Sequence, residues 1–428
     1  MSQTAHFDIK EHIVPGCYIR EYPSIVKGRQ EELLHLHVKQ YTPRDGLLPN
    51  RDAVTLIAMH GIGLPKELYE PLWDTLYEQS ASCGFSIRAI WIADMASHGG
   101  SGILNEKTMS NDFSWMDHAR DVLSMINHFH EQMPRPLIGV GHSCGGLQMA
   151  QLSFMHPRLF TSLIFLDPGF IVSPTPLGLL GDGPGPVNFN TYRRDLWRNR
   201  AAAASFVENV SPDWDKRAIG LMVKYGFRDL PTALYPELPP NANLSDPPVT
   251  LTTTKHQSCL AQIRPCFDLE KANGRFVVNR ETHPDLDAAK ADARVPFYRP
   301  ELFPTMDRLP TLRPSALFVL GKDTTKTWKD SMRNAARIAG TGVGGSGGME
   351  DGRIREVFAH GGHMFPFTAV LETAQACAAW IGDEIGRYSS QEKKWNNERS
   401  KMSERAHLVV PAKWMEIVRH PKDIKTKL

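Results

Sequence analysis

The chain has 428 residues, of which 41% are hydrophobic and 22% are charged, a composition typical of folded globular proteins. Its formal net charge of +2 argues against general binding to nucleic acid. No apolar run is long enough to span a membrane, and the N-terminus lacks the charged-then-apolar layout of a signal peptide. The six cysteines are scattered without a Cys-x-x-Cys pair, which favours a reducing intracellular compartment and predicts neither a metal site nor a disulfide framework.

Strands and a helix alternate along the first 170 residues. The run 54–59 is continuously apolar, as in a central parallel strand, and it leads into the loop His60-Gly61-Ile62-Gly63. Apolar residues recur at helical spacing across 113–131. Further strands are expected at 34–38, 88–92, 137–141 and 160–166. This alternation predicts a doubly wound α/β fold with a mostly parallel central sheet.

A G-x-S-x-G pattern, Gly141-His142-Ser143-Cys144-Gly145, stands between the strand at 137–141 and a helical run at 147–154. Strand, sharp turn and helix form the context of a nucleophile elbow, in which strain lifts the serine Oγ into the site. The pattern predicts Ser143 as the nucleophile of an α/β-hydrolase fold. An aspartate would stand at this position in epoxide hydrolases or dehalogenases.

The alternation stops after residue 170 and resumes near 306. Residues 171–305 are rich in proline and glycine, with short helical pieces such as 196–209, and we expect an inserted cap over the substrate pocket. The core is therefore expected to comprise 1–170 and 306–388. Its second part should contain a strand at 315–320, helices at 327–339 and 367–387, and a strand at 353–358. The glycine-rich run 340–348 follows a helix instead of a strand, so it predicts a loop and no dinucleotide site.

A serine nucleophile needs a base and an orienting acid, in the chain order serine, acid, histidine. His363, in the loop after the last expected strand, is the predicted base, with His360 as the alternative. Two aspartates are candidates for the orienting acid: Asp323 follows the strand at 315–320, and Asp167 follows the strand at 160–166. Both positions lie at the carboxyl edge of the sheet.

An oxyanion hole needs two backbone N–H groups aimed at the developing charge. We expect them from Cys144, directly after the nucleophile, and from Ile62, directly after His60-Gly61. The Cys144 side chain is interpreted as a small residue that fills the elbow and takes no part as a nucleophile. No metal or cofactor is required by this arrangement.

The C-terminal residues 389–428 form a charged extension. Its apolar residues around 408–418 should dock on this subunit or on a second copy in a homodimer. The last three residues, Thr426-Lys427-Leu428, are similar to the Ser-Lys-Leu peroxisomal signal that an import receptor reads. The extension therefore predicts a peroxisomal location, with the cytoplasm as the alternative.

The chain resembles fungal α/β-hydrolases of secondary metabolism, above all their peroxisomal acyl-CoA hydrolases and more distantly those of toxin biosynthesis. The resemblance rests on Glu11–Gly16, His60–Trp73, Ser114–Asp121, Met133–Leu137 and Gly344–Gly348. It implies an acyl-CoA thioesterase that releases a free acid, and it implies Asp167 as the acid, with Asp323 second. A carboxylesterase or lactonase, an acyltransferase and a non-catalytic binding protein remain alternatives, and the substrate would be an acyl-CoA or an ester.

Overall fold

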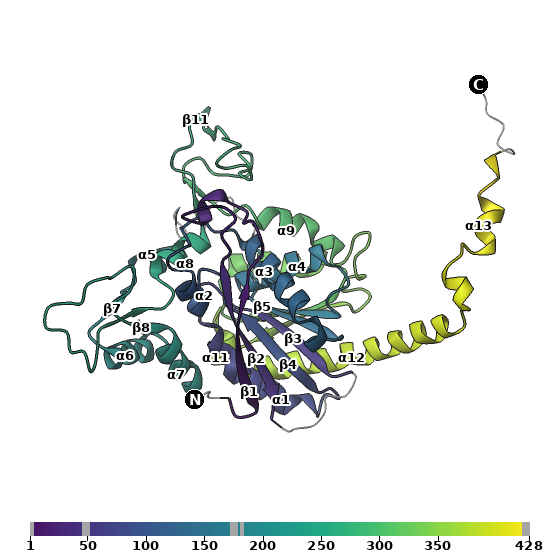
Figure 1. The fold of residues 1–428 in the computed structure, drawn as a ribbon, viewed down its shortest axis with the longest axis horizontal. Coiled ribbons are helices and arrows are strands. Elements are labelled where there is room, and N and C mark those ends of the chain that lie inside the picture. Colours follow the sequence, from purple (N-terminus) through teal and green to yellow (C-terminus); the bar gives the residue numbers. More distant parts are fainter. Residues whose placement is uncertain (1–3, 45–51, 172–178, 180–183, 422–428) are drawn as a thin grey trace. The chain divides into compact units, whose positions relative to one another are not determined.

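The computed structural model describes residues 4–44, 52–171, 179 and 184–421. The chain divides into two compact units, Met1–Gly382 and Asp383–Leu428. Figure 1 labels the helices and strands in chain order. Among the described residues, no helix has both the length and the apolar character that crossing a membrane requires.

An eight-stranded sheet forms the centre of the first unit, with the strand order β1-β2-β4-β3-β5-β6-β14-β15. The pairs β1–β2 and β2–β4 are antiparallel, and all other neighbours are parallel. The strands are β1 (Phe7–Pro15), β2 (His35–Pro43), β3 (Val54–Met59), β4 (Ile87–Ala93), β5 (Leu137–His142), β6 (Ser162–Leu166), β14 (Ser315–Gly321) and β15 (Ile354–Ala359). The predicted α/β fold with a mostly parallel sheet is confirmed, and β1 is an edge strand that the sequence did not predict.

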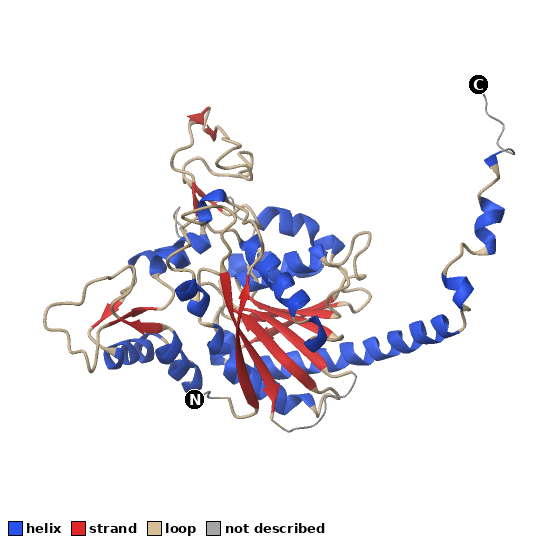
Figure 2. Cartoon of the chain, in the orientation of Figure 1, coloured by secondary structure: helices blue, strands red, loops and turns tan. Residues whose placement is uncertain are grey.

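Helices cover both faces of the sheet (Figure 2). The core cluster on one face contains residues of α3 (Trp115–His128), α4 (Cys144–Met155) and α10 (Lys326–Ile338). On the other face, Trp380 of α12 (Val370–Ser400) donates its indole N–H to Ser162 Oγ of β6 at 2.8 Å. The helix α1 (Glu70–Ser80) packs beside β4. Burial on both faces explains why every residue of β3, β5, β6 and β14 is buried.

Between β6 and β14 the structure has short elements and two small apolar clusters. The helices here are α5 (Pro186–Tyr192), α6 (Arg200–Val210), α7 (Lys216–Tyr225), α8 (Lys255–Gln262) and α9 (Leu302–Arg308). The strands are β7 (Leu196–Trp197), β8 (Phe227–Asp229), β9 (Val249–Leu251), β10 (Arg264–Pro265), β11 (Lys271–Ala272), β12 (Arg275–Phe276) and β13 (Phe297–Tyr298). Strands of two or three residues have no detectable period, so the sequence could not predict them. One apolar cluster surrounds Trp197 and the other surrounds Phe276.

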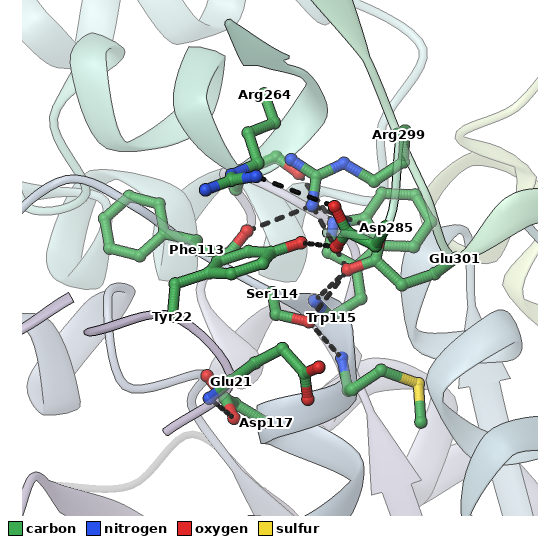
Figure 3. Close-up of polar contacts among 12 residues, drawn as sticks. Glu21, Tyr22, Phe113, Ser114, Trp115, Asp117, Arg264, Asp285, Arg299 and Glu301 are labelled. Atoms are coloured by element: carbon green, nitrogen blue, oxygen red, sulfur yellow. Dashed lines mark hydrogen bonds and ion pairs between the residues drawn. The ribbon is translucent and has the colours of Figure 1, made fainter. Parts of the chain in front are cut away.

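Hydrogen bonds and ion pairs link the later part of this segment to the start of α3 (Figure 3). Glu301 accepts hydrogen bonds from Ser114 Oγ at 2.9 Å and from the Trp115 N–H at 2.7 Å. Arg264 pairs with both carboxylate oxygens of Asp112, at 2.7 and 2.8 Å. These contacts hold the segment against the core through buried charged groups, in addition to apolar packing by Leu260 and Ala261.

The second unit contains the end of α12, the 3₁₀ turn Glu404–His407 and α13 (Ala412–Ile417). All described residues from 393 onward are exposed, including the apolar Leu408 and Trp414. Docking of this apolar surface in a homodimer stays a prediction. The expected signal Thr426-Lys427-Leu428 lies outside the described residues.

Candidate active site

Ser143 stands in the sharp turn between β5 and α4. Its backbone has φ 57° and ψ −124°, a strained conformation for a residue with a side chain. The turn tolerates only glycine at the two positions that lie two residues before and two residues after Ser143. A Cβ at Gly145 would lie 2.3 Å from the Met59 carbonyl oxygen, and one at Gly141 would lie 2.5 Å from the Gly145 oxygen. The two glycines therefore allow the turn that places the Ser143 side chain at the carboxyl end of β5.

The three side chains expected to act together meet at this edge. His363 Nε2 lies 3.0 Å from Ser143 Oγ, and His363 Nδ1 lies 3.0 Å from Asp167 Oδ2. Ser143 follows β5, Asp167 follows β6, and His363 lies between β15 and the short helix α11 (Phe365–Thr368). Because these strands end at one edge of the sheet, residues up to 220 positions apart form one hydrogen-bonded chain.

The Asp167 carboxylate is buried, and both of its oxygens accept hydrogen bonds. Besides His363, it accepts hydrogen bonds from the Gly321 N–H at 2.9 Å and from Thr324 Oγ1 at 2.6 Å. Burial alone would raise its pKa, but the hydrogen bonds from His363, Thr324 and Gly321 outweigh burial and lower it. Asp167 is therefore ionised at neutral pH and can orient the imidazole and stabilise its charged form.

The two alternatives from the sequence lie elsewhere. Asp323 is exposed, and within the described part of the chain its side chain makes no hydrogen bond to His363. The His360 side chain is 76% exposed and pairs with Glu372 at 2.8 Å. The structure thus brings Asp167 and His363 to Ser143 and leaves the alternatives at the surface.

The two expected oxyanion donors flank the nucleophile. A Cβ built on Gly61, next to Ile62, would lie 3.3 Å from Ser143 Cβ, so this loop lies directly against the elbow. Outside the regular hydrogen bonds of helices and strands, neither the Ile62 nor the Cys144 N–H of the described chain donates to a backbone carbonyl. Burial raises the pKa of the Cys144 thiol to about 12, so it stays protonated and is no second nucleophile.

Four further residues around the site were missed by the sequence analysis. Thr324 supports Asp167, the Trp328 ring packs edge-on against His363 at 5.2 Å, and Tyr69 and His142 hydrogen-bond to each other. His142 lies inside the G-x-S-x-G pattern and Thr324 directly follows Asp323, so both were close to positions already singled out. Tyr69 lies inside the stretch His60–Trp73 on which the family resemblance rests, but nothing in that stretch indicates its hydrogen bonds, and nothing in the sequence marks Trp328. Among the described residues, no group of three or more His, Cys, Asp or Glu side chains could hold a metal ion.

Comparison with known proteins places the chain in a family. The model of the alpha/beta hydrolase family matches residues 56–380. The type I acyl-CoA thioesterase mpaH' of Penicillium brevicompactum is 47% identical over 426 residues, covering 97% of this chain and 96% of that protein. The type I acyl-CoA thioesterase mpaH of Penicillium roqueforti (strain FM164) is 46% identical, with 96% and 95% covered.

More distant matches agree in fold. The abhydrolase domain-containing protein AFT2-1 of Alternaria alternata is 30% identical over 149 residues, 35% of this chain and 52% of that protein. The crystal structure of the peroxisomal alpha-beta-hydrolase Lpx1 of Saccharomyces cerevisiae superposes with a TM-score of 0.61 at 15% identity, covering 94% of this chain and all of that one. The chain belongs to the alpha/beta hydrolase family.

Proposed function

We propose that this protein is an acyl-CoA thioesterase that forms an acyl-enzyme on Ser143. The hydrogen-bonded chain from Ser143 through His363 to Asp167 carries the proposal of a serine hydrolase. The thioester preference rests on relatives named as acyl-CoA thioesterases that match over nearly the whole chain.

The reaction needs two similar steps. His363 Nε2 takes the Ser143 proton while Oγ attacks the thioester carbonyl, and the Ile62 and Cys144 N–H groups bind the resulting oxyanion. The C–S bond then breaks, and His363 returns the proton to the CoA thiolate. In the second step, water gives a proton to His363 and attacks the acyl-enzyme. The bond between the acyl carbon and Ser143 Oγ then breaks, and His363 returns the proton to Oγ, which releases the free acid and restores Ser143. Asp167 stabilises the imidazolium in both steps.

The segment 171–305 has the position of a cap in this proposal. Leu260 and Ala261 of α8 pack in an apolar cluster that also touches Ile62, the proposed oxyanion donor. An acyl group on Ser143 would therefore meet apolar side chains from both the core and this segment. The cap is proposed to select the acyl group, while the core supplies the chemistry.

Release of free thiol from a panel of acyl-CoAs, measured beside hydrolysis of p-nitrophenyl esters, tests the proposed function. Ser143→Ala serves as the control for background hydrolysis. We expect Ser143-dependent thiol release from acyl-CoAs that carry bulky acyl groups, with slower turnover of the esters. Ester hydrolysis without thiol release would instead identify a carboxylesterase.

We also propose a peroxisomal location, read by the import receptor from Thr426-Lys427-Leu428. A fluorescent protein carrying residues 383–428 at its C-terminus should collect in peroxisomes. The same fusion without the last three residues should stay in the cytoplasm, and equal distribution of both would contradict the proposal.

A further inference from the structure

A chain of three hydrogen bonds joins the oxyanion loop, residues 60–63, to the backbone of the proposed base, His363. The Gly61 N–H donates to Tyr69 Oη at 3.1 Å, and Tyr69 Oη lies 2.8 Å from His142 Nδ1. His142 Nε2 lies 3.0 Å from the carbonyl oxygen of His363. Tyr69 and His142 are almost fully buried, so no water competes for these groups.

The chemistry of the partners fixes where the hydrogens lie. The His363 carbonyl can only accept, so His142 Nε2 must carry a proton. Burial, together with the neighbouring His363, lowers the pKa of His142 to about 3, so the ring is neutral and Nδ1 has no proton. Tyr69 therefore donates its hydroxyl hydrogen to His142 Nδ1 while it accepts from Gly61. Each polar atom in the chain is satisfied in only one way.

Aromatic packing fixes the rings that carry these bonds. Phe367 meets both Tyr69 and His142 edge-on, with ring centroids 5.2 and 5.8 Å away, and Trp73 stacks on Tyr69 at 5.9 Å. The rings therefore have little freedom to rotate, and the hydrogen bonds hold two backbone groups, the Gly61 N–H and the His363 carbonyl, at fixed spacing. These groups lie in the loops after β3 and β15, and His142 is the last residue of β5.

We propose that Tyr69 and His142 are positioning residues of this active site. Through Gly61 they hold the Ile62 N–H, and through the His363 carbonyl they hold the imidazole, both relative to Ser143. The inference rests on the proposed serine-hydrolase function, because a fixed spacing of donor and base matters only if both act on one reacting carbonyl. Neither residue touches the substrate in this proposal.

Tyr69→Phe is the most direct test, since it removes one oxygen atom and keeps the ring. We expect kcat to fall about 10- to 100-fold, the usual cost of losing a group that orients a catalytic residue, with KM changed less than about threefold. Tyr41→Phe is the matched control. The Tyr41 ring is also fully buried, and its hydroxyl donates to a buried carboxylate, Glu70, at 3.0 Å. That variant should lose stability but keep kcat within about threefold.

A second pair of variants tests the other end of the chain. Glutamine at position 142 can still donate to the His363 carbonyl, whereas leucine cannot. We expect kcat to fall in the order wild type, His142→Gln, His142→Leu. The double variant Tyr69→Phe/His142→Leu should lose less than the product of the two single losses, because both substitutions break the same chain.

Labelling of Ser143 by a fluorophosphonate separates this inference from the proposed substrate. If the wild type labels Ser143 but cleaves no acyl-CoA, the thioesterase proposal fails, and the labelling rates of the same variants still test the positioning role. Wild-type rates in both Tyr69→Phe and His142→Leu would overturn the inference. So would a loss in Tyr41→Phe as large as that in Tyr69→Phe.

Discussion

The carboxyl edge of the sheet and the segment 171–305 differ in how they are held together. At the sheet edge, the loops after β3, β5, β6 and β14 rest on fully buried strands. Polar groups of these loops and of the loop after β15 hydrogen-bond to one another. The described part of the segment 171–305 has short strands and two small apolar clusters, and it is linked to the core by hydrogen bonds and ion pairs. The sheet edge is thus suited to holding the catalytic side chains at fixed distances. The segment is suited to changing which acyl groups reach those side chains.

The largest expected effect is on the nucleophile. Ser143→Ala should lower kcat for thioester cleavage about 10⁴-fold or more, since the proposed acyl-enzyme forms on the Ser143 Oγ that this substitution removes. Its thermal unfolding should stay close to that of the wild type. Steady-state thiol release measures the loss, and residual activity above one per cent would show that another residue carries the reaction.

The second-largest effect is expected from substitution of the orienting acid, Asp167. Asp167→Asn should lower kcat about 10³- to 10⁴-fold, because an amide favours the wrong imidazole tautomer and cannot stabilise its charge. Asp323→Asn is the matched control, since Asp323 is exposed and sits at the end of the adjacent strand β14. It should keep activity within about twofold. A reversed pattern between the two variants would assign the acid to Asp323.

A buried ionic cluster of Lys39, Lys66 and Glu67 should contribute to the free energy of unfolding. Glu67 lies 3.1 Å from both Lys39 and Lys66. Burial alone would raise the pKa of Glu67, but the two lysines lower it to about 2. Glu67→Gln leaves the lysine charges buried with fewer partners and should cost about 3 kcal/mol at pH 7.

The pH dependence of that loss follows from the lowered pKa. The contribution of Glu67 is fully present above its ordinary pKa of 4.5 and is lost as the pH falls toward about 2. The difference in unfolding free energy between wild type and Glu67→Gln should therefore shrink between pH 4.5 and pH 2. Urea unfolding at pH 7, 4.5 and 3.5 measures it, and a difference that grows on acidification would contradict this account.

The smallest effect is expected in the segment 171–305. Arg264→Met removes the pair with Asp112 and the contact of the guanidinium with the Tyr22 ring, 3.8 Å away. We expect KM for a bulky acyl-CoA to rise about three- to tenfold, with hydrolysis of p-nitrophenyl acetate nearly unchanged. An equal loss on both substrates would mean that this segment supports the chemistry as well as selection.

The sequence could predict those parts of the fold that are local. The run 54–59 matches β3, and Ser143, Asp167 and His363 each follow an expected strand, so parallel topology alone brings them to one edge. Thr324 and Tyr69 could not be predicted, because their roles depend on hydrogen bonds to residues 157 and 73 positions from Thr324 and Tyr69, respectively. The choice of Asp167 over Asp323 came from the family resemblance, since both aspartates end neighbouring strands.

The most direct test of Ser143 as the nucleophile is mass spectrometry of the enzyme quenched with acid during turnover of an acyl-CoA. We predict an acyl adduct on the peptide that contains Ser143, formed as CoA is released and lost on hydrolysis. His363→Ala should form this adduct far more slowly. Release of CoA with no adduct at any time, or an adduct on a different residue, would contradict the account.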